Sequence, residues 1–327
     1  MPPLVTDLND FPTGQRGGIV AIGNFDGVHR GHASIACRTA LRARELGVSA
    51  VALTFDPHPA AVLRADQVPP QLAWIERRCE LLGEFGIDTS AVCRTDRALL
   101  KLTPAEFFER IVVQRLGARG LVEGENFRFG RNRSGTIETL KELAMAHHVA
   151  VEVVEPCHYE GAPISSSRIR DAVAEGDVEA AAAMLGRSHR VRGRVTTGAG
   201  RGRQIGFPSA NLSEIQGVLP AEGVYASRAL HRSETWPAAV NVGPNPTFGE
   251  SQRKVEAHLI GFSGDLYGGG LEIDFLARLR GVIAFPSVAE LISQIERDLC
   301  RTREIAASAP IAESSRPASC GPKRGDR

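Results

Sequence analysis

The sequence predicts an α/β chain in which a parallel sheet with covering helices is followed by a small β-barrel and a terminal helix. Two observations predict this fold class. Between residues 18 and 185, short apolar runs alternate with stretches of helical periodicity, which is the pattern of a parallel sheet. Between residues 191 and 279 the apolar runs are all of strand type, and turns rich in Gly, Pro, Asn and Asp separate them.

The elements of the first half follow from these runs. Its strands are short and rich in β-branched residues, as is typical of strands buried on both faces. One helix opens with the capping box Thr103-Pro104-Ala105-Glu106. We expect strands at residues 18–22, 49–55, 87–93, 120–123 and 149–154, and helices at 33–46, 74–85, 103–116, 136–146 and 171–185.

The second half contains five expected strands and one helix. The amphipathic stretch 287–299 is expected to pack on the outside of the barrel. From about residue 306 the composition turns to Ala, Ser, Pro, Arg and Gly, which predicts a disordered tail. We expect strands at 191–197, 223–230, 238–242, 255–262 and 271–279, and domains at 1–186 and 187–305, with the tail at 306–327.

The bulk properties restrict the class of protein. A length of 327 residues suits two domains, and a net charge of +1 gives no basic field of the kind that binds nucleic acid. No apolar run is long enough to cross a membrane, and the first residues do not resemble a signal peptide. The six cysteines form no Cys-x-x-Cys pair, which favours reduced thiols over disulfides or a zinc site. We therefore expect a cytoplasmic protein.

Residues 23–32 form the most informative stretch, because they join a buried strand to a helix. Gly23 and Gly27 allow a tight turn and a close approach of ligand to backbone. His29 and His32 are three residues apart at the helix start, so both imidazoles project from one face beside N–H groups that favour phosphate. The stretch holds no thiol or hydroxyl nucleophile, which indicates phosphate stabilisation rather than covalent catalysis. The alternative is a glycine-rich turn with two surface histidines.

Two polar segments follow later strands of the first half. Residues 124–135 are rich in glycine and contain three arginines, so they form either a solvated loop or a lid over a nucleotide. Three hydroxyls, at Ser165, Ser166 and Ser167, come before Arg168 at a helix start. They are either ordinary N-caps or, together with the guanidinium and free N–H groups, a cradle for phosphates.

The second half contains two candidate features. Residues 198–211 are a glycine-rich stretch that lacks the Gly-Lys-Ser/Thr end of a P-loop, so it is either a hairpin loop or a backbone cover over phosphates. Glu256 alternates with Val255 and Ala257 along a strand, so its face meets either solvent or a cleft. In a cleft it is a candidate to accept the proton of an attacking hydroxyl.

Five motifs carry a resemblance that covers residues 15 to 300. The pattern Gly-x-Phe-Asp-Gly-Val-His-x-Gly-His at residues 23–32 resembles the signature of HxGH nucleotidyltransferases, which have a Rossmann-like domain, and most closely the prokaryotic bifunctional riboflavin kinase/FAD synthetase family. Residues 124–130, 164–170, 206–211 and 255–259 resemble further motifs of that family. Ser167 and Ser209 stand where the family usually has Thr, and serine keeps the hydroxyl group.

The resemblance implies a role for individual residues. His29, His32 and Arg168 would be catalytic in adenylyl transfer, and Glu256 would be the base of the kinase. Ser209 and Asn211 would hold Mg²⁺. Nucleotide and phosphate would be bound by Gly23, Phe25, Asp26, Gly27, Asn126, Ser165, Ser166, Ser167, Gly198, Gly200, Gly202 and Gly206, and flavin by Asn241, Asn245, Pro246, Thr247 and Phe262.

The resemblance also implies two reactions. Riboflavin and ATP would give FMN in the barrel, and FMN with a second ATP would give FAD and pyrophosphate in the sheet domain. Flavins are then substrates and products, no redox cofactor is implied, and protein partners stay unknown. Two alternatives are a nucleotidyltransferase for another phosphate ester and a non-catalytic flavin-binding regulator.

Overall fold

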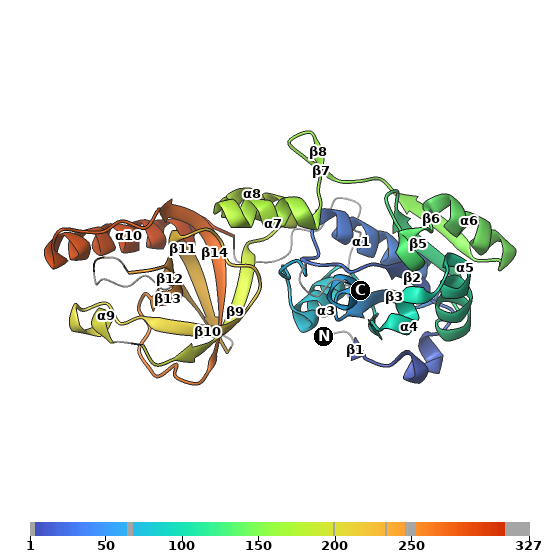
Figure 1. Ribbon diagram of the computed structural model, residues 1–327, viewed down its shortest axis with the longest axis horizontal. Coiled ribbons are helices and arrows are strands. Elements are labelled where there is room, and N and C mark those ends of the chain that lie inside the picture. Colours follow the sequence, from blue (N-terminus) through green and yellow to red (C-terminus); the bar gives the residue numbers. More distant parts are fainter. Residues whose placement is uncertain are drawn as a thin grey trace. The chain divides into compact units, whose positions relative to one another are not determined.

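The computed structural model describes residues 4–63, 68–198, 200–232, 234–245, 247 and 253–310 (Figure 1). The chain divides into two compact units. Of the described residues, the first unit contains those up to Pro69 and from Ile75 to Ser165, and the second contains Pro70–Trp74 and those from Ser166 to Pro310. Each unit has its own sheet and its own core.

The first unit is built on a six-stranded sheet in which every pairing is parallel, as predicted. The strand order is β1-β4-β3-β2-β5-β6, so the chain extends the sheet on one side of β2 and then returns to add β5 on the other. The strands are β1 (Leu4–Val5), β2 (Ile19–Ile22), β3 (Ala50–Asp56), β4 (Thr89–Arg94), β5 (Gly120–Gly124) and β6 (Ala150–Val154).

Both faces of this sheet are buried. Ile19, Ala21 and Val122 belong to one apolar cluster, and Val20 and Leu121 belong to another, because successive side chains point to opposite faces. The helices of this unit are α1 (Arg30–Glu45), α2 (Pro59–Leu63), α3 (Ile75–Glu84), α4 (Arg97–Lys101), α5 (Pro104–Phe107) and α6 (Ile137–Ala146), with the π-helix η4 (Phe108–Arg115).

The predicted capping box at Thr103 is confirmed. Thr103 Oγ1 accepts a hydrogen bond from Glu106 N–H at 3.3 Å, and Glu106 Oε2 accepts one from Thr103 N–H at 2.9 Å. The helix that starts there changes to π geometry at Phe108, which the apolar periodicity did not indicate.

The predicted helix 171–185 is two helices, and both belong to the second unit. They are α7 (Ser166–Glu175) and α8 (Val178–Leu185). Gly176 has φ +82°, and Asp177 caps α8 by accepting a hydrogen bond from Ala180 N–H at 2.8 Å. These two residues end one helix and begin the next. The Ala-rich pattern on both sides of them led to the prediction of a single helix.

The second unit contains a closed barrel of six antiparallel strands in the order β10-β13-β12-β11-β14-β9, which confirms the predicted barrel. Its interior is apolar, with Val240, Ala257 and Phe275 fully buried. Sequence analysis missed β10 because its residues are mostly polar. The strands are β9 (His189–Thr196), β10 (Ala210–Gln216), β11 (Gly223–His231), β12 (Glu234–Gly243), β13 (Lys254–Leu259) and β14 (Gly270–Arg280).

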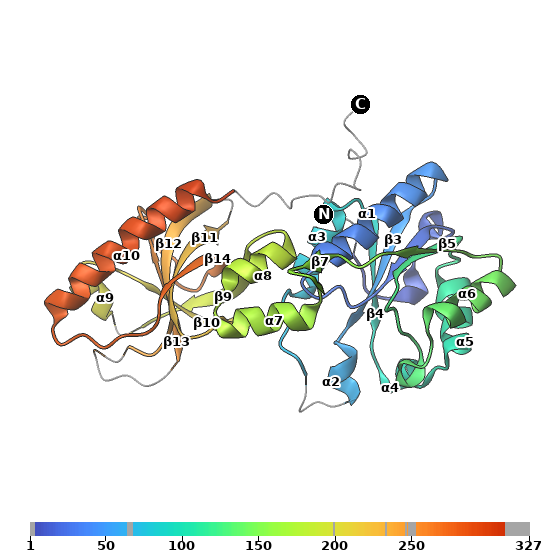
Figure 2. The ribbon, with the colours of Figure 1, turned by 90° about the horizontal axis from the view of Figure 1, so that it is seen from above.

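The terminal helix α10 (Val288–Ser308) runs along the barrel beside β11, β12 and β14 (Figure 2). It is longer than the predicted 287–299, and Arg228 donates to Ala306 O at 2.7 Å and Pro310 O at 2.6 Å beyond the predicted end. The start of the predicted tail is therefore helical. Residues 311–327 lie outside the described part of the chain, so disorder there stays a prediction.

Three further expectations can be compared with the structure. The second compact unit begins at Ser166, because α8 packs on β9 and β14, and the predicted domain boundary after Gly186 stays a prediction. Cys79, Cys93, Cys157 and Cys300 are free thiols, as expected, whereas Cys37 is disulfide-bonded, so the expectation of a reduced thiol is wrong there. Linear spacing does not show which cysteines meet in space. Within the described ranges, none of the helices has the length and apolar character that a membrane crossing requires.

Candidate functional sites

The first cavity lies in the first unit and has a volume of about 850 Å³. Gly23, which follows β2, and Gly124, which ends β5, both line it. β2 and β5 are neighbours at the point where the strand order reverses, and open parallel sheets bind ligands at such points. The fold therefore places the 23–32 stretch where a ligand is expected.

The two predicted imidazoles lie against each other in this cavity. The rings of His29 and His32 are stacked, with centroids 3.6 Å apart and planes inclined by 17°. His29 is the N-cap of α1, and its Nδ1 accepts a hydrogen bond from His32 N–H at 3.3 Å. Since Nδ1 is an acceptor, we assign the proton of the neutral His29 ring to Nε2. His29 can therefore donate to a phosphate oxygen through Nε2.

The turn before these histidines is held from inside the protein. Phe25 and Val28 have φ of 47° and 39°, values that non-glycine residues rarely adopt. Asp26 is buried, and its Oδ1 lies 4.0 Å from Nη2 of the buried Arg78. Burial lowers the pKa of Arg78, and the negative charge of Asp26 opposes that shift. Gly23 and Phe25 line the cavity, whereas Asp26 and Gly27 do not.

The loop 124–135 forms part of the cavity wall, and Asn126 lines the cavity, while its contact with a nucleotide stays a prediction. The loop is closed at its neck by backbone hydrogen bonds between Phe129 and Gly135, of 3.2 and 2.9 Å. Arg131 N–H also donates to Leu102 O at 2.7 Å. These bonds fix the shape of the loop beside the cavity.

The serine cluster is divided between the two units. Ser165 is the last residue of the first unit, while Ser166, Ser167 and Arg168 start α7 in the second. None of these four residues is among those that line the described first cavity. Their predicted contribution to a phosphate cradle with His29 stays a prediction.

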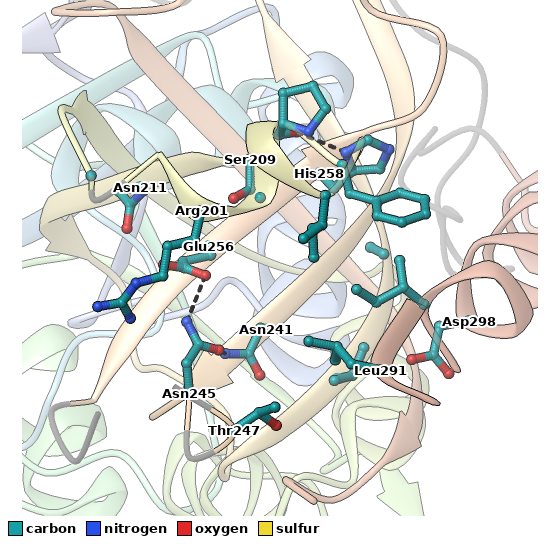
Figure 3. Close-up of a pocket in the computed structure, with 18 of the residues that line it drawn as sticks. Arg201, Ser209, Asn211, Asn241, Asn245, Thr247, Glu256, His258, Leu291 and Asp298 are labelled. Atoms are coloured by element: carbon teal, nitrogen blue, oxygen red, sulfur yellow. Dashed lines mark hydrogen bonds between the residues drawn. The ribbon is translucent and has the colours of Figure 1, made fainter. Parts of the chain in front are cut away.

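The second cavity lies in the second unit, between the outer wall of the barrel and α10, with a volume of about 410 Å³ (Figure 3). Glu256 on β13 is opposite Asn211 on β10 and opposite Asn241 on β12. All three side chains line this cavity. The sheet register therefore places a carboxylate between two amides, which resolves the choice between cleft and solvent in favour of the cleft.

Hydrogen bonds fix the orientation of Glu256. Its Oε2 accepts from Asn245 Nδ2 at 2.9 Å, and Asn245 Oδ1 accepts from Asn241 Nδ2 at 3.3 Å (Figure 3). His258 lies on the same face, with its Nδ1 2.7 Å from Pro208 O. The carboxylate is thus held in place and still borders the cavity.

The glycine-rich stretch covers one side of this cavity. It contains the short helix α9 (Arg201–Gln204), which was not predicted. A Cβ atom on Gly198 would lie 2.1 Å from Asn211 Nδ2, and one on Gly202 would lie 2.4 Å from Phe207 O. Only glycine fits at position 202, because the neighbouring atom is backbone, whereas a side chain at position 198 would have to displace the Asn211 amide.

The remaining predicted residues of this site fall into three groups. Gly198, Gly200, Gly202, Ser209, Asn245 and Thr247 line the cavity with the residues above. Gly206, with φ +91°, and Phe262, which packs edge-on against Trp236 at 5.1 Å, do not line it. Pro246 lies outside the described residues.

The part of the cavity wall that α10 supplies was not predicted from the sequence. Asp298 accepts hydrogen bonds from Arg280 Nε at 2.9 Å and from Gln294 Nε2 at 2.8 Å, and both Asp298 and Arg280 line the cavity. Leu291 and Ile295 add apolar surface. A signal was present, because an aspartate stands on the apolar stripe of an amphipathic helix, where an unpaired charge is costly.

Comparisons with known proteins cover both units. A family model described as FAD synthetase matches residues 12–168, and one described as riboflavin kinase matches residues 185–306. The chain is 35% identical to a bifunctional riboflavin kinase/FMN adenylyltransferase of Pseudomonas fluorescens, over 93% of this chain and 98% of the relative. It is 33% identical to a protein of the same name from Escherichia coli K12, over 92% and 96%.

A solved structure from Streptococcus pneumoniae, described as a macrolide-efflux protein, is also similar. It has a TM-score of 0.81 and 29% sequence identity, and the match covers 92% of this chain and 98% of that one. The two family models together account for both cavities described above. The chain therefore belongs to the bifunctional riboflavin kinase/FMN adenylyltransferase family, and it contains both catalytic domains of that family.

Proposed function

We propose that the second cavity converts riboflavin and ATP to FMN and ADP, with Glu256 as the general base. The observation that carries this proposal is the row of Asn211, Glu256 and Asn241 across three barrel strands. Glu256 accepts the proton of the ribityl 5′-hydroxyl as the oxygen of that hydroxyl attacks the γ-phosphorus, and ADP leaves. Asn245 keeps the carboxylate pointed at the cavity through its 2.9 Å hydrogen bond.

A magnesium ion fits the donor set of this cavity. The Ser209 hydroxyl and the Asn211 amide oxygen are hard oxygen ligands, and Mg²⁺ is commonly held by few protein groups together with substrate phosphates. Within the described residues no group of three or more His, Cys, Asp or Glu side chains could hold a metal, which is compatible with such a sparse site. When bound, the ion would neutralise charge on the ATP phosphates.

We assign adenylyl transfer to the first cavity. The FMN phosphate attacks the α-phosphorus of ATP, and pyrophosphate leaves. The attacking phosphate already carries negative charge, so the protein needs no general base. The stacked imidazoles support a different role, because His29 Nε2–H can donate to phosphate oxygens as charge develops. Arg168 and Ser165 to Ser167 are proposed to add to this phosphate site.

One experiment tests the assignment against both alternatives. The purified chain is incubated with riboflavin, ATP and Mg²⁺, and the flavins are separated by chromatography. Sequential appearance of FMN and FAD supports the proposal. No conversion of riboflavin or of added FMN would favour a flavin-binding regulator, and adenylylation of another phosphate ester alone would favour a different transferase. We further propose a cytoplasmic location and no nucleic-acid or membrane partner, which fractionation of cells would check.

A further inference from the structure

Glu123 is a buried carboxyl that the two reactions do not use. Its side chain is 1% exposed, on β5 directly before the loop that carries Asn126. By strand alternation it shares a face of the sheet with Leu121, whose cluster includes Phe107 and Phe129. A carboxyl in such apolar surroundings requires an explanation.

The position of Glu123 coincides with an opening in the sheet. β2 and β5 are paired only at Ile19 with Gly120 and at Val20 with Leu121. Ile19 N–H and Gly23 N–H donate toward β3, so the intervening Ile22 N–H is directed toward β5. Glu123 Oε1 accepts that hydrogen bond at 2.7 Å. The side chain therefore replaces the backbone pairing that is lost where the strands separate.

The other oxygen of the carboxyl borders the ligand space. Glu123 lines the first cavity, and within the described chain the only hydrogen bond of its side chain is the one that Oε1 accepts from Ile22 N–H. Burial raises the pKa of Glu123 well above its usual range, and the hydrogen bond from Ile22 opposes the shift only in part. Oε2 is thus the natural position for a proton.

We propose that Glu123 is a positioning residue for adenylyl transfer: by accepting the hydrogen bond from Ile22 N–H, its side chain fixes the end of β2 beside Gly23, at the edge of the cavity that receives the phosphates. A carboxylate at this point would face the anionic groups of both ATP and FMN. The inference rests on the assignment of adenylyl transfer to this cavity. The kinase cavity lies wholly in the second unit, so its activity is an internal control in the same sample.

Other groups in the cavity titrate and must be separated from Glu123. The apolar neighbours on its own face carry no charge, and β2 has no ionisable residue. The ionisable and charged side chains that line the same cavity are His29, His32, His58, Glu125, Arg128, Arg133, Glu155 and Cys157. Each of them is also present in a Glu123→Gln variant, so the ratio of wild-type to variant activity isolates Glu123.

The test compares Glu123→Gln with Glu123→Leu in the full chain. Gln keeps an acceptor for Ile22 N–H and is always uncharged, whereas Leu has a similar size and no acceptor. We expect FMN-to-FAD turnover within about threefold of wild type for Gln and reduced about tenfold or more for Leu, since a buried N–H is left unpaired. Riboflavin-to-FMN turnover should not change in either variant.

The pH dependence gives a second readout that a structural role alone would not move. The ratio of wild-type to Gln activity should stay constant through about pH 4 to 6, where an ordinary glutamate ionises, and fall only at higher pH. Three outcomes would overturn the proposal. Glu123→Gln could be as inactive as Glu123→Leu, or Glu123→Leu could be as active as wild type. The third is a ratio of wild-type to Glu123→Gln activity that changes near pH 4 to 6. If Glu123→Leu fails to fold, the activity of Glu123→Gln and the pH dependence of the activity ratio still test the proposal. His29→Ala with full FAD synthesis would instead refute the assignment of the cavity.

Discussion

Arg78 donates a hydrogen bond of 2.8 Å from Nη1 to the carbonyl oxygen of Asn24, inside the turn that leads to the two histidines. The guanidinium is 1% exposed, and Asp26 is its buried counter-charge. α3 (Ile75–Glu84) therefore supports the turn that leads to the two histidines from the protein interior.

Replacing Arg78 with Met should destabilise the first unit by about 3–5 kcal/mol, because the buried carboxylate of Asp26 would lose its guanidinium counter-charge. Urea unfolding monitored with the adenylyl-transfer activity would measure this loss. The double variant Arg78→Met/Asp26→Asn is the control, and it should recover part of the stability. A single variant as stable as wild type would show that the pair does not support the turn.

Replacing His29 with Ala should lower FAD formation by about 10²–10³-fold, since a donor to the developing phosphate charge is lost. FMN should accumulate, because the kinase cavity contains no residue of the first unit. Chromatography of flavins over time measures both steps. His158→Ala, at an exposed position outside the cavity, is the matched control and should be neutral. Loss of both activities in a folded His29 variant would contradict the two-site assignment.

Replacing Glu256 with Gln should slow FMN formation by about 10²–10⁴-fold, the usual contribution of a general base. Added FMN should still be converted to FAD at the wild-type rate. Initial rates with riboflavin and with FMN, measured separately, give the comparison. Glu234→Gln, at the exposed start of β12, removes a carboxylate of the same barrel outside the cavity and should have no effect. A fall of less than threefold for Glu256→Gln would exclude it as the base.

Replacing Gly198 with Ala should weaken the kinase and raise the Mg²⁺ concentration needed for half-maximal activity, because the added Cβ would displace the Asn211 amide. We expect a loss of about tenfold or more at limiting Mg²⁺. Gly270→Ala is the matched control, since a Cβ there meets nothing within 4 Å. Equal Mg²⁺ dependence in both variants would argue against Asn211 as a ligand.

Much of the fold could be predicted because periodicity is a local property. The apolar runs of β2 and β3 correctly predicted strands of a parallel sheet, and the strand pattern of the second half correctly predicted a barrel. β10 was missed because its outward face carries Asn211, Ser213 and other polar residues, so its apolar content is low. Its role in the cavity is a property of the register with β13, which no single stretch encodes.

The candidate sites were predicted unevenly for the same reason. His29, Ser209 and Glu256 are in compact motifs, and the structure places each at a cavity. Arg78, Glu123 and Asp298 are single residues whose significance depends on partners 54, 101 and 18 positions away in the chain. A sequence alone does not show that those partners are near.

The left-handed backbone at Phe25 and Val28 has a consequence for substrate capture. A β-branched residue at φ 39° is a conformation that a free chain seldom visits, so the surrounding protein imposes it during folding. Under the proposed assignment, the turn already has its binding shape before the nucleotide arrives, so little ordering entropy is lost on association. Preorganisation of this kind lowers the stability of the unliganded protein, and it does not lower the affinity for the ligand.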